Sequence, residues 1–268
     1  MKIIIGTANF NKKYGILKKK FNNTDLSKLS KKIKKENLFI DTAQVYNNNK
    51  IIKKLNQKRK IFSKFKINFK KKNNYEFTNL KIRNQLKELN ISKFYGLMFN
   101  DLNNIFYFKK NEIKKYILSI KKKKIAKFVG VSVYSPSEIK KVLKIFSPDF
   151  IQFPLNIFDK RFISNKNLQV LKKKNIKLIA RSCFLQGIIL KESFPFNNMR
   201  DKIIFNQFQY WLKKEKLSAL TAAINFIKNK NKVDFLVIGV NNYSQLKEIS
   251  QIIKSKKKIH VKTFKDMT

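Results

Sequence analysis

Asp41, Tyr46 and Lys64 are three residues whose side chains together could carry out proton transfer. A tyrosine has an ordinary pKa of about 10, so it is a poor acid near neutral pH. A nearby lysine ammonium stabilises the phenolate and lowers that pKa, and a carboxylate paired with the ammonium holds it in place. Such a tyrosine can protonate an oxyanion when hydride reaches a carbonyl carbon. The residues also allow a structural interpretation, in which Asp41 caps a helix, Tyr46 is a surface aromatic and Lys64 is one lysine among many.

Eight short apolar runs with the composition of β-strands must position these side chains. They cover residues 3–7, 38–42, 60–64, 94–100, 127–133, 150–153, 176–181 and 235–240. Segments with helical spacing lie between them, and the clearest cover residues 25–36, 78–89, 137–146 and 217–227. Residues 191–216 are predicted to form a loop and an extra helix, and residues 243–268 one helix with a short extension.

The alternation of strand, polar turn and helix favours a parallel sheet with crossover helices. Eight such units in about 250 residues match the length of a (β/α)8 barrel. The alternative is a doubly wound open sheet, which usually carries a glycine-rich phosphate loop after its first strand. Gly6-Thr7-Ala8-Asn9-Phe10 follows the first strand instead, and neither GxGxxG nor GxxxxGK[ST] occurs in the chain. No linker rich in proline, glycine or serine divides the chain, so we predict one α/β domain over residues 1–268, a (β/α)8 TIM barrel.

The polar residues that end the eight runs are expected to surround one site, because the carboxyl ends of barrel strands face the active site. They are Gly6, Thr7, Asp41, Thr42, Lys64, Asn100, Asp101, Ser132, Gln152, Asn156, Arg181, Ser182, Gly239, Asn241 and Asn242. Asp41 and Lys64 of the possible proton-transfer set are therefore predicted to lie on the same side of the barrel, with Tyr46 just after the second run.

Short motifs at these strand ends resemble the aldo-keto reductase family over nearly the whole chain. Residues 41–46 read DTAQVY, which is similar to the family pattern DTAxxY, and residues 61–64 read IFSK, like the strand that carries the catalytic lysine. Residues 95–101 read YGLMFND, residues 130–135 GVSVYS, and residues 151–159 IQFPLNIFD. Residues 180–187 read ARSCFLQG, and residues 239–242 read GVNN. Together with GTANF at residues 6–10, these make eight motifs. Each is weak alone, but eight in order at barrel spacing are specific.

The resemblance implies a NAD(P)-dependent oxidoreductase that reduces an aldehyde or ketone by hydride transfer. Tyr46 would be the proton donor, tuned by Lys64 and Asp41, and Asn100 would stand where the family has its fourth catalytic residue, a histidine. The dinucleotide would lie extended across the barrel mouth. Its expected contacts are Gly6, Thr7, Ser132, Gln152, Arg181, Ser182, Phe184, Gln186, Gly187, Gly239, Asn241, Asn242, Gln245 and Glu248.

The resemblance also divides these contacts along the dinucleotide. Ser132 and Gln152 would meet the nicotinamide carboxamide, and Arg181 occupies the place where many members stack an aromatic ring on the nicotinamide. Residues 182–187 would wrap the pyrophosphate. The end of the eighth run and the helix that follows would hold the adenosine phosphate and the adenine.

Several residues depart from the family pattern. The amide of Asn100 can donate a hydrogen bond but cannot shuttle a proton as histidine does. This leaves an alternative, a catalytically weakened or silent barrel of the same kind that binds a cofactor or metabolite. Asn47 replaces the glycine that usually follows the tyrosine, and Gln245 replaces an arginine that NADP-preferring members use for the 2′-phosphate. The excess of lysine, including Lys247, still favours NADP(H) over NAD(H).

Composition excludes several classes of protein. Hydrophobic residues make up 43% of the 268 residues, which excludes intrinsic disorder. No apolar stretch approaches the length that spans a bilayer, and the N-terminus lacks the apolar region of a signal peptide. We therefore expect a cytoplasmic protein with no membrane partner. The single Cys183 and the single His260 exclude a zinc cluster and a Cys–His nucleophilic pair, so no metal is predicted.

The formal net charge of +46 indicates either a polyanion partner or a composition bias. Five of the 62 basic residues are arginine and 57 are lysine, spread over nearly every polar segment. Sites that read phosphates and bases favour arginine, so we expect a small-molecule carbonyl substrate and no specific nucleic acid. A polyanion binder built on this fold remains the third alternative. Charge of one sign opposes self-association, which predicts a monomer or a weak oligomer.

Overall fold

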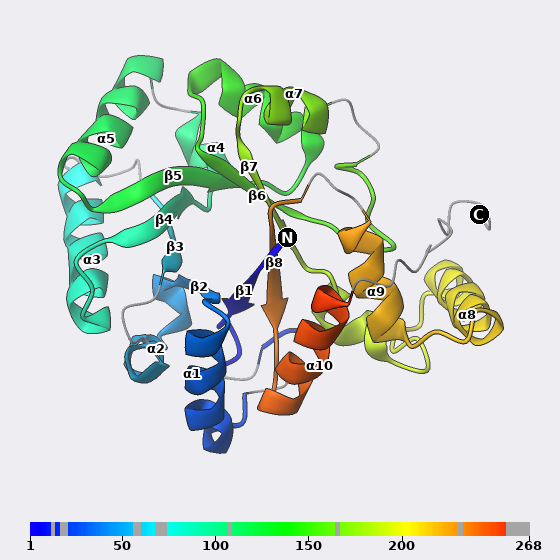
Figure 1. The fold of residues 1–268 in the computed structure, drawn as a ribbon. Coiled ribbons are helices and arrows are strands. Elements are labelled where there is room, and N and C mark those ends of the chain that lie inside the picture. The colour runs from blue at the N-terminus through cyan, green and yellow to red at the C-terminus, as the bar shows by residue number, and fades with distance from the viewer. Residues whose placement is uncertain are drawn as a thin grey trace.

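Eight parallel strands close into a barrel in chain order, with β8 hydrogen-bonded to β1 (Figure 1). The computed structural model describes residues 1–11, 14–16, 21–55, 60–67, 74–106, 109–163, 167–229 and 233–255. The strands are β1 (Lys2–Gly6), β2 (Phe39–Ala43), β3 (Ile61–Phe65), β4 (Phe94–Phe99), β5 (Ala126–Ser132), β6 (Phe150–Pro154), β7 (Lys177–Arg181) and β8 (Phe235–Gly239). The predicted (β/α)8 TIM barrel is confirmed, and every strand boundary lies within one residue of its predicted position.

Helices surround the barrel, and α8 lies at the periphery beyond α9 (Figure 1). The α-helices are α1 (Leu26–Lys35), α2 (Asn49–Leu55), α3 (Asn74–Leu89), α4 (Leu102–Ile105), α5 (Lys110–Lys122), α6 (Pro136–Ile145), α7 (Asn167–Lys173), α8 (Met199–Lys214), α9 (Ala219–Lys228) and α10 (Tyr243–Lys254). Short 3-10 helices are η1 (Asn23–Asp25), η2 (Gln44–Tyr46) and η3 (Leu185–Leu190). The predicted extra helix is α8 and the predicted last helix is α10, while the extension after residue 255 lies outside the described residues.

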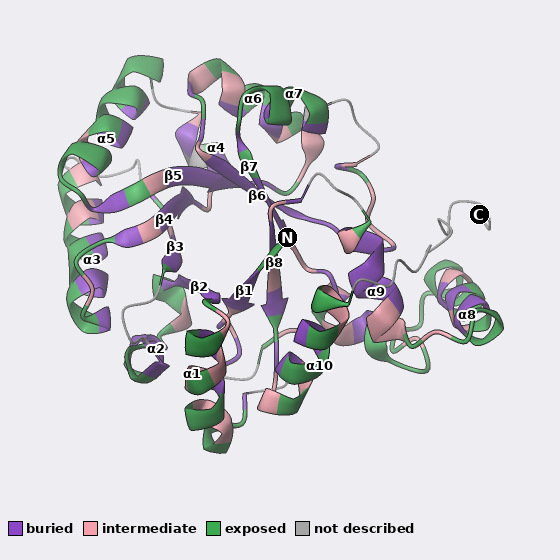
Figure 2. Cartoon of the chain, viewed as in Figure 1, coloured by how far each residue is buried: buried purple, intermediate pink, exposed green. Residues whose placement is uncertain are grey.

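The helix α6 shows how local sequence sets an element in place. Ser135 and Glu138 form a capping box at its start, and Pro136 occupies the first turn, where its missing N–H costs nothing. Ile139 and Val142 face inward and are buried. Figure 2 shows the same pattern around the molecule, since the strands are largely buried and the outer faces of the helices are exposed. In the described residues no helix is both long and apolar enough to cross a membrane.

An aromatic floor fills the amino end of the barrel. Its rings come from the first two residues of their strands, and they are Phe39, Phe62, Tyr95, Phe150 and Phe235. The ring centroids of Phe62 and Phe150 lie 5.2 Å apart, edge to face, as aromatic pairs prefer. A Cβ on Gly96 would lie 2.3 Å from the Phe62 ring, so only glycine leaves room for that ring. Because the amino end is packed with rings, ligands must reach the barrel from its carboxyl end.

Candidate active site

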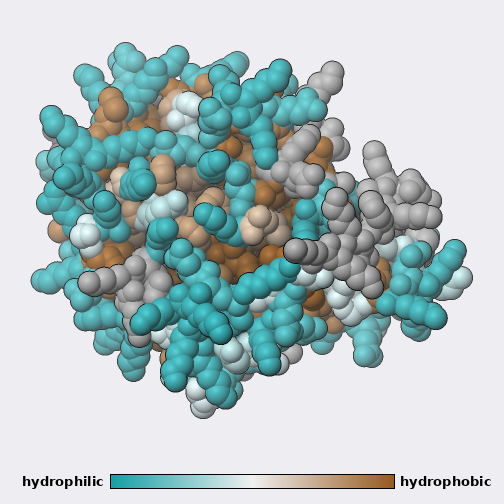
Figure 3. All heavy atoms as spheres, viewed as in Figure 1, coloured by the Kyte–Doolittle hydropathy of each residue, from teal (hydrophilic) through white to brown (hydrophobic). Residues whose placement is uncertain are grey.

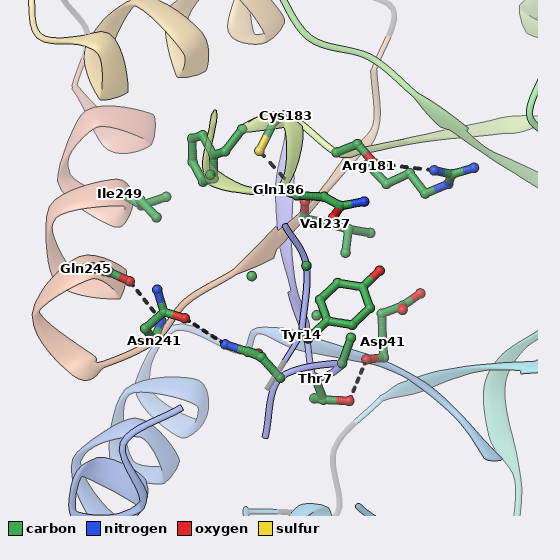
Figure 4. A pocket seen from close by; sticks show the side chains of 18 of the residues that line it. Thr7, Tyr14, Asp41, Arg181, Cys183, Gln186, Val237, Asn241, Gln245 and Ile249 are labelled. Atoms are coloured by element: carbon green, nitrogen blue, oxygen red, sulfur yellow. Dashed lines mark hydrogen bonds between the residues drawn. The ribbon is translucent and has the colours of Figure 1, made fainter. Parts of the chain in front are cut away.

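A cavity of about 760 Å³ lies at the carboxyl ends of the strands (Figure 4). It is lined by almost every residue predicted for the site, namely Gly6, Thr7, Asp41, Tyr46, Lys64, Asn100, Ser132, Gln152, Arg181, Ser182, Phe184, Gln186, Gly187, Gly239, Asn241, Gln245 and Glu248. Asn242 does not line the cavity, because it caps α10 and its side chain accepts a hydrogen bond from the Gln245 N–H at 2.9 Å. Thr42, Asp101 and Asn156, which were also predicted to surround the site, do not line the cavity either. The Thr42 hydroxyl donates to Asn48 instead, and Asn156 Oδ1 accepts from the Phe158 N–H within its own loop. The cavity thus collects residues from the carboxyl ends of all eight strands, as expected for a barrel.

Asp41 and Lys64 form a buried ion pair between the neighbouring strands β2 and β3. Their side chains are only 5% and 9% exposed, and the Lys64 ammonium donates a hydrogen bond to Asp41 Oδ1. The second carboxylate oxygen, Oδ2, accepts from Gln152 Nε2 at 2.8 Å. Buried charges are tolerated when they are paired and hydrogen-bonded in this way. The interpretation of Asp41 as a helix cap is wrong, because the residue lies inside β2.

Tyr46 ends η2, directly after β2, and its ring centroid lies 5.8 Å from Lys64 Nζ. Burial raises the pKa of Tyr46 well above its ordinary value, and the negative charge of Asp41 raises that pKa further. The lowered pKa expected from Lys64 is therefore not found. The main reason is burial of the phenol, and the charge of the Asp41 carboxylate, which is paired with Lys64, adds to it. Tyr46 is a protonated phenol at neutral pH, which is the form that donates a proton.

A buried hydrogen-bond network anchors the loop that carries Tyr46. Asn48 Nδ2 donates to the Thr7 carbonyl oxygen at 2.6 Å, and its Oδ1 accepts from Thr42 Oγ1 at 3.1 Å. Asn47, just before it, has a left-handed backbone with φ of 48°. Glycine adopts this conformation most easily and asparagine tolerates it, which explains how Asn47 can stand in the usual place of a glycine. Sequence reasoning missed Asn48, although the run of three asparagines after Tyr46 was a signal.

Two further tyrosines lie beside Tyr46, and the predicted site did not include them. Tyr14 follows β1 and its ring centroid lies 6.4 Å from that of Tyr46. Tyr134 follows β5, and the Arg181 guanidinium carbon lies 4.4 Å from the centroid of its ring. The phenols of both tyrosines raise the pKa of Tyr46, whereas the Arg181 charge lowers it. Tyr134 directly follows a predicted strand, which was a signal that could have found it, whereas Tyr14 lies further along the loop after the first run.

The far end of the cavity is formed by the loops after β1 and β7 and by α10. Ile16 N–H donates to Gln186 Oε1 at 2.9 Å, which joins the two loops beside the cavity. Asn9 Nδ2 donates to Asn241 Oδ1 at 3.0 Å, and Gln245 Oε1 accepts from the Asn241 N–H at 2.8 Å. Figure 4 shows Gln245 and Asn241 at the opposite end from Asp41. The Gln245 amide oxygen is thus used in fixing its own loop.

The cavity residues fit a nicotinamide dinucleotide. Ser132 Oγ is buried at the cavity wall and has no hydrogen-bond partner among the described residues, so it is available to an amide. A Cβ on Gly239 would meet nothing within 4 Å, which leaves the backbone open to a close-lying ligand. Among the described residues there is no group of three or more His, Cys, Asp or Glu side chains that could hold a metal.

One family model matches nearly the whole chain, and solved structures share its fold. The family model described as the Aldo/keto reductase family matches residues 2–265. No curated protein sequence matches the chain. A solved aldo-keto reductase from Bacillus halodurans, in its holo form, has 14% identity and a TM-score of 0.78, covering 100% of this chain and 92% of that one. A glycerol dehydrogenase from Gluconobacter oxydans has 17% identity and a TM-score of 0.68, covering 94% and 86%.

At these identities the solved structures show only that the fold is shared. The family model matches nearly the whole sequence and therefore shows the family. The fold, the cavity and the sequence match point the same way. The chain belongs to the aldo/keto reductase family, whose members are oxidoreductases that reduce carbonyl compounds with nicotinamide cofactors.

Proposed function

We propose that this protein reduces an aldehyde or ketone with NAD(P)H and that Tyr46 donates the proton to the carbonyl oxygen. The observation that carries the proposal is the buried Asp41–Lys64 pair, which lies beside Tyr46 on the cavity wall. A bound nicotinamide supplies the hydride. The side chains of the protein then have to supply a proton, stabilise the charge that develops and hold these groups in place.

Each residue of the group has a role in that step. Tyr46 is protonated and gives its proton to the oxygen as negative charge develops there. The Lys64 ammonium stabilises the phenolate that remains, because its charge lies 5.8 Å from the centre of the ring. Asp41 keeps Lys64 in position, and Gln152 holds the second oxygen of Asp41.

The dinucleotide would be held by groups along the cavity wall. Ser132 Oγ and Gln152 would bind the carboxamide, Arg181 would border the nicotinamide, and residues 182–187 would contact the pyrophosphate. Lys64 and Arg181 are the cations among the described lining residues. Lys64 is paired with Asp41, and Figure 4 shows Arg181 away from Gln245. We therefore propose that NADP(H) is preferred over NAD(H) by a small margin only. A strong preference needs a cation beside the 2′-phosphate, and no described lining cation lies near Gln245.

The variant Tyr46→Phe tests the proposal. It removes the proton donor and keeps the ring, so we expect turnover to fall by about 10²- to 10⁴-fold. We expect the dissociation constant of NADPH, measured by fluorescence titration, to change by less than about threefold, because the variant keeps the ring and loses only one hydroxyl group. Tyr210→Phe, at an exposed position on α8, is the matched control. Retention of most activity by Tyr46→Phe would show that the assigned role is wrong.

A second candidate function is that of a weakened or silent reductase that binds a cofactor or metabolite. The observation in its favour is Asn100, which lines the cavity at the end of β4 and cannot carry a proton as a histidine would. Asn100→His distinguishes the two functions in a carbonyl-reduction assay. A gain in turnover of about tenfold or more favours the weakened enzyme, whereas an unchanged or lower rate shows that asparagine suits the native reaction.

A further inference from the structure

Arg181 brings a positive charge to the cavity that no acidic residue neutralises. It ends β7, and among the described residues no carboxylate forms an ion pair with its guanidinium. The other lining cation, Lys64, is paired with Asp41. Glu248 also lines the cavity, but it belongs to α10, and Figure 4 shows the α10 residues Gln245 and Ile249 at the end opposite to Asp41. The charge of Arg181 is therefore available to a ligand at the catalytic end.

The guanidinium is held in place by its neighbours without using all its donors. Nη2 donates to the Val133 carbonyl oxygen at 3.2 Å and Nη1 donates to Ser182 Oγ at 3.3 Å. A guanidinium has five N–H groups, so three are left for a ligand. The Tyr134 ring packs at 4.4 Å from the guanidinium carbon and fixes its plane through a cation–π contact. A fixed planar fork is the geometry that recognises carboxylate and phosphate oxygens.

Hydrogen bonds also fix the backbone of Tyr134, on which the Arg181 guanidinium packs. Glu138 Oε2 accepts from the Tyr134 N–H at 2.6 Å and from the Ser135 N–H at 3.2 Å, which fixes the start of α6 and the residue before it. Tyr134 is 54% exposed, so core packing does not hold it in place. The backbone hydrogen bond to Glu138 and the contact with Arg181 hold it instead. Figure 4 shows Arg181 and Asp41 toward the same end of the cavity. Arg181 is also close enough to Tyr46 for its charge to act on the phenol.

We propose that Arg181 selects carbonyl substrates that carry an anionic group, either a carboxylate or a phosphate, near the carbonyl. The anion lies on the guanidinium while the carbonyl oxygen faces Tyr46. This inference rests on the proposed carbonyl reduction and adds the class of substrate to it. The role differs from general attraction by the lysine-rich surface, because it depends on one side chain and on its fork geometry.

Matched pairs of substrates separate the anion from the rest of the molecule. We would measure kcat/KM for phenylglyoxylate against its neutral methyl ester, and for glyceraldehyde 3-phosphate against glyceraldehyde. Salt at about 0.3 M screens the exposed lysines, so the comparison reports the cavity. In the wild type we expect the anion of at least one pair to be preferred, and the preferred pair identifies carboxylate or phosphate as the recognised group.

Three variants test the residue. Arg181→Met is expected to lower the ratio of kcat/KM for the anion to kcat/KM for the neutral substrate by about 10- to 100-fold. This is the size of effect expected when charge-assisted, bidentate hydrogen bonds are lost. Arg181→Lys is expected to keep part of the ratio, because it retains the charge and loses the planar donors. Arg83→Met removes an exposed charge on α3, outside the cavity, and is expected to leave the ratio unchanged. An unchanged ratio in Arg181→Met, with turnover still measurable, overturns the inference and leaves the proposed function standing.

A binding measurement covers the case in which no carbonyl is reduced. Calorimetric titration with phenylglyoxylate and with glyceraldehyde 3-phosphate, at the same salt, needs no turnover. Saturable binding that is lost in Arg181→Met supports the anion site even if the proposed reduction fails. Absence of saturable binding in the wild type, together with absence of anion preference in turnover, overturns the anion site.

Discussion

The Tyr46 hydroxyl lies among groups that oppose its ionisation. Burial and the Asp41 carboxylate raise the pKa of Tyr46, the neighbouring phenols of Tyr14 and Tyr134 add to the effect, and the charge of Arg181 acts against them. A phenol in such surroundings keeps its proton over the whole physiological range of pH. The site is therefore set for donation to a carbonyl oxygen, and the reverse step, which needs a phenolate, is disfavoured at neutral pH.

This environment predicts how the two directions of the reaction depend on pH. Carbonyl reduction uses the protonated phenol, so its kcat is expected to stay level from about pH 6 to about pH 9, well below the raised pKa. Alcohol oxidation uses the phenolate, so its kcat is expected to rise over the same range. Initial rates in both directions, in one buffer series, provide the measurement. A fall of the reduction rate with an apparent pKa near neutrality would contradict the raised pKa of Tyr46.

Individual site residues could be predicted where the rule was about position along a strand. Asp41, Lys64, Ser132 and Gln152 lie among the last three residues of their strands, and the barrel brings the carboxyl ends of its strands together. The direction of the Tyr46 pKa shift could not be predicted, because it depends first on how deeply the phenol is buried and then on which charged groups lie near it. Both are set by the positions of side chains on different strands, which the sequence does not contain.

At the scale of elements, α1 and α10 are joined by one carboxylate. Glu36 directly follows α1 and accepts hydrogen bonds from Lys32 at 2.8 Å, from Lys254 at 2.6 Å and from Ser250 at 3.0 Å. Lys254 and Ser250 belong to α10, the helix that supplies Gln245 and Glu248 to the cavity wall. Partial burial acts to raise the pKa of Glu36, and the hydrogen bonds outweigh it, so that pKa lies below its ordinary value.

Removal of this carboxylate is expected to destabilise the fold in a way that depends on pH. A lowered pKa in the folded state adds stability above the unfolded pKa of about 4.3, and this stability is lost as the pH falls through the folded value. Glu36→Gln is expected to cost about 1 kcal/mol of unfolding free energy at pH 7 and clearly less at about pH 3. Urea unfolding at the two pH values measures the difference, with Glu192→Gln at an exposed site as control. A cost that is equal at both values would rule out the charge as its cause.

The strands were easier to predict from the sequence than the helices. Parallel strands buried on both faces read as short, continuous apolar runs bounded by polar residues, and all eight were found on that basis. The longer helix α5 was not assigned bounds, and neither were the short helices α2, α4 and α7, which have four to seven residues. Helices of this length are not stable by themselves and form only because neighbouring elements pack against them.

Charge dominates the molecule as a whole. Figure 3 shows hydrophilic side chains spread over most of the drawn face, in keeping with the even distribution of lysine along the chain. The described residues form seven ion pairs, whereas the chain has 62 basic and 16 acidic residues. Repulsion between like charges therefore outweighs attraction in the folded state. The same charge attracts polyanions without any built site, and it opposes oligomer formation.

Salt is expected to stabilise this protein against heat. The screening length is about 10 Å at 0.1 M salt and shortens further above it, so added salt relieves the repulsion between the lysines. We expect the Tm to rise by several degrees between about 0.05 M and about 0.5 M NaCl. Differential scanning fluorimetry measures the shift, and KCl in place of NaCl is expected to give the same result. A Tm that falls with salt would mean that the ion pairs contribute more to stability than the repulsion removes.

The aromatic floor also limits the paths by which this sequence could have evolved. In a chain with six glycines, a drift toward lysine and asparagine codons could place Asn47 after Tyr46, since asparagine accepts the left-handed backbone there. Gly130 has no such substitute, because a Cβ would lie 2.5 Å from the Phe150 carbonyl oxygen, which belongs to the backbone. At Gly96 the obstacle is the Phe62 ring. Any lineage that replaces Gly96 must therefore first have exchanged Phe62 for a smaller residue.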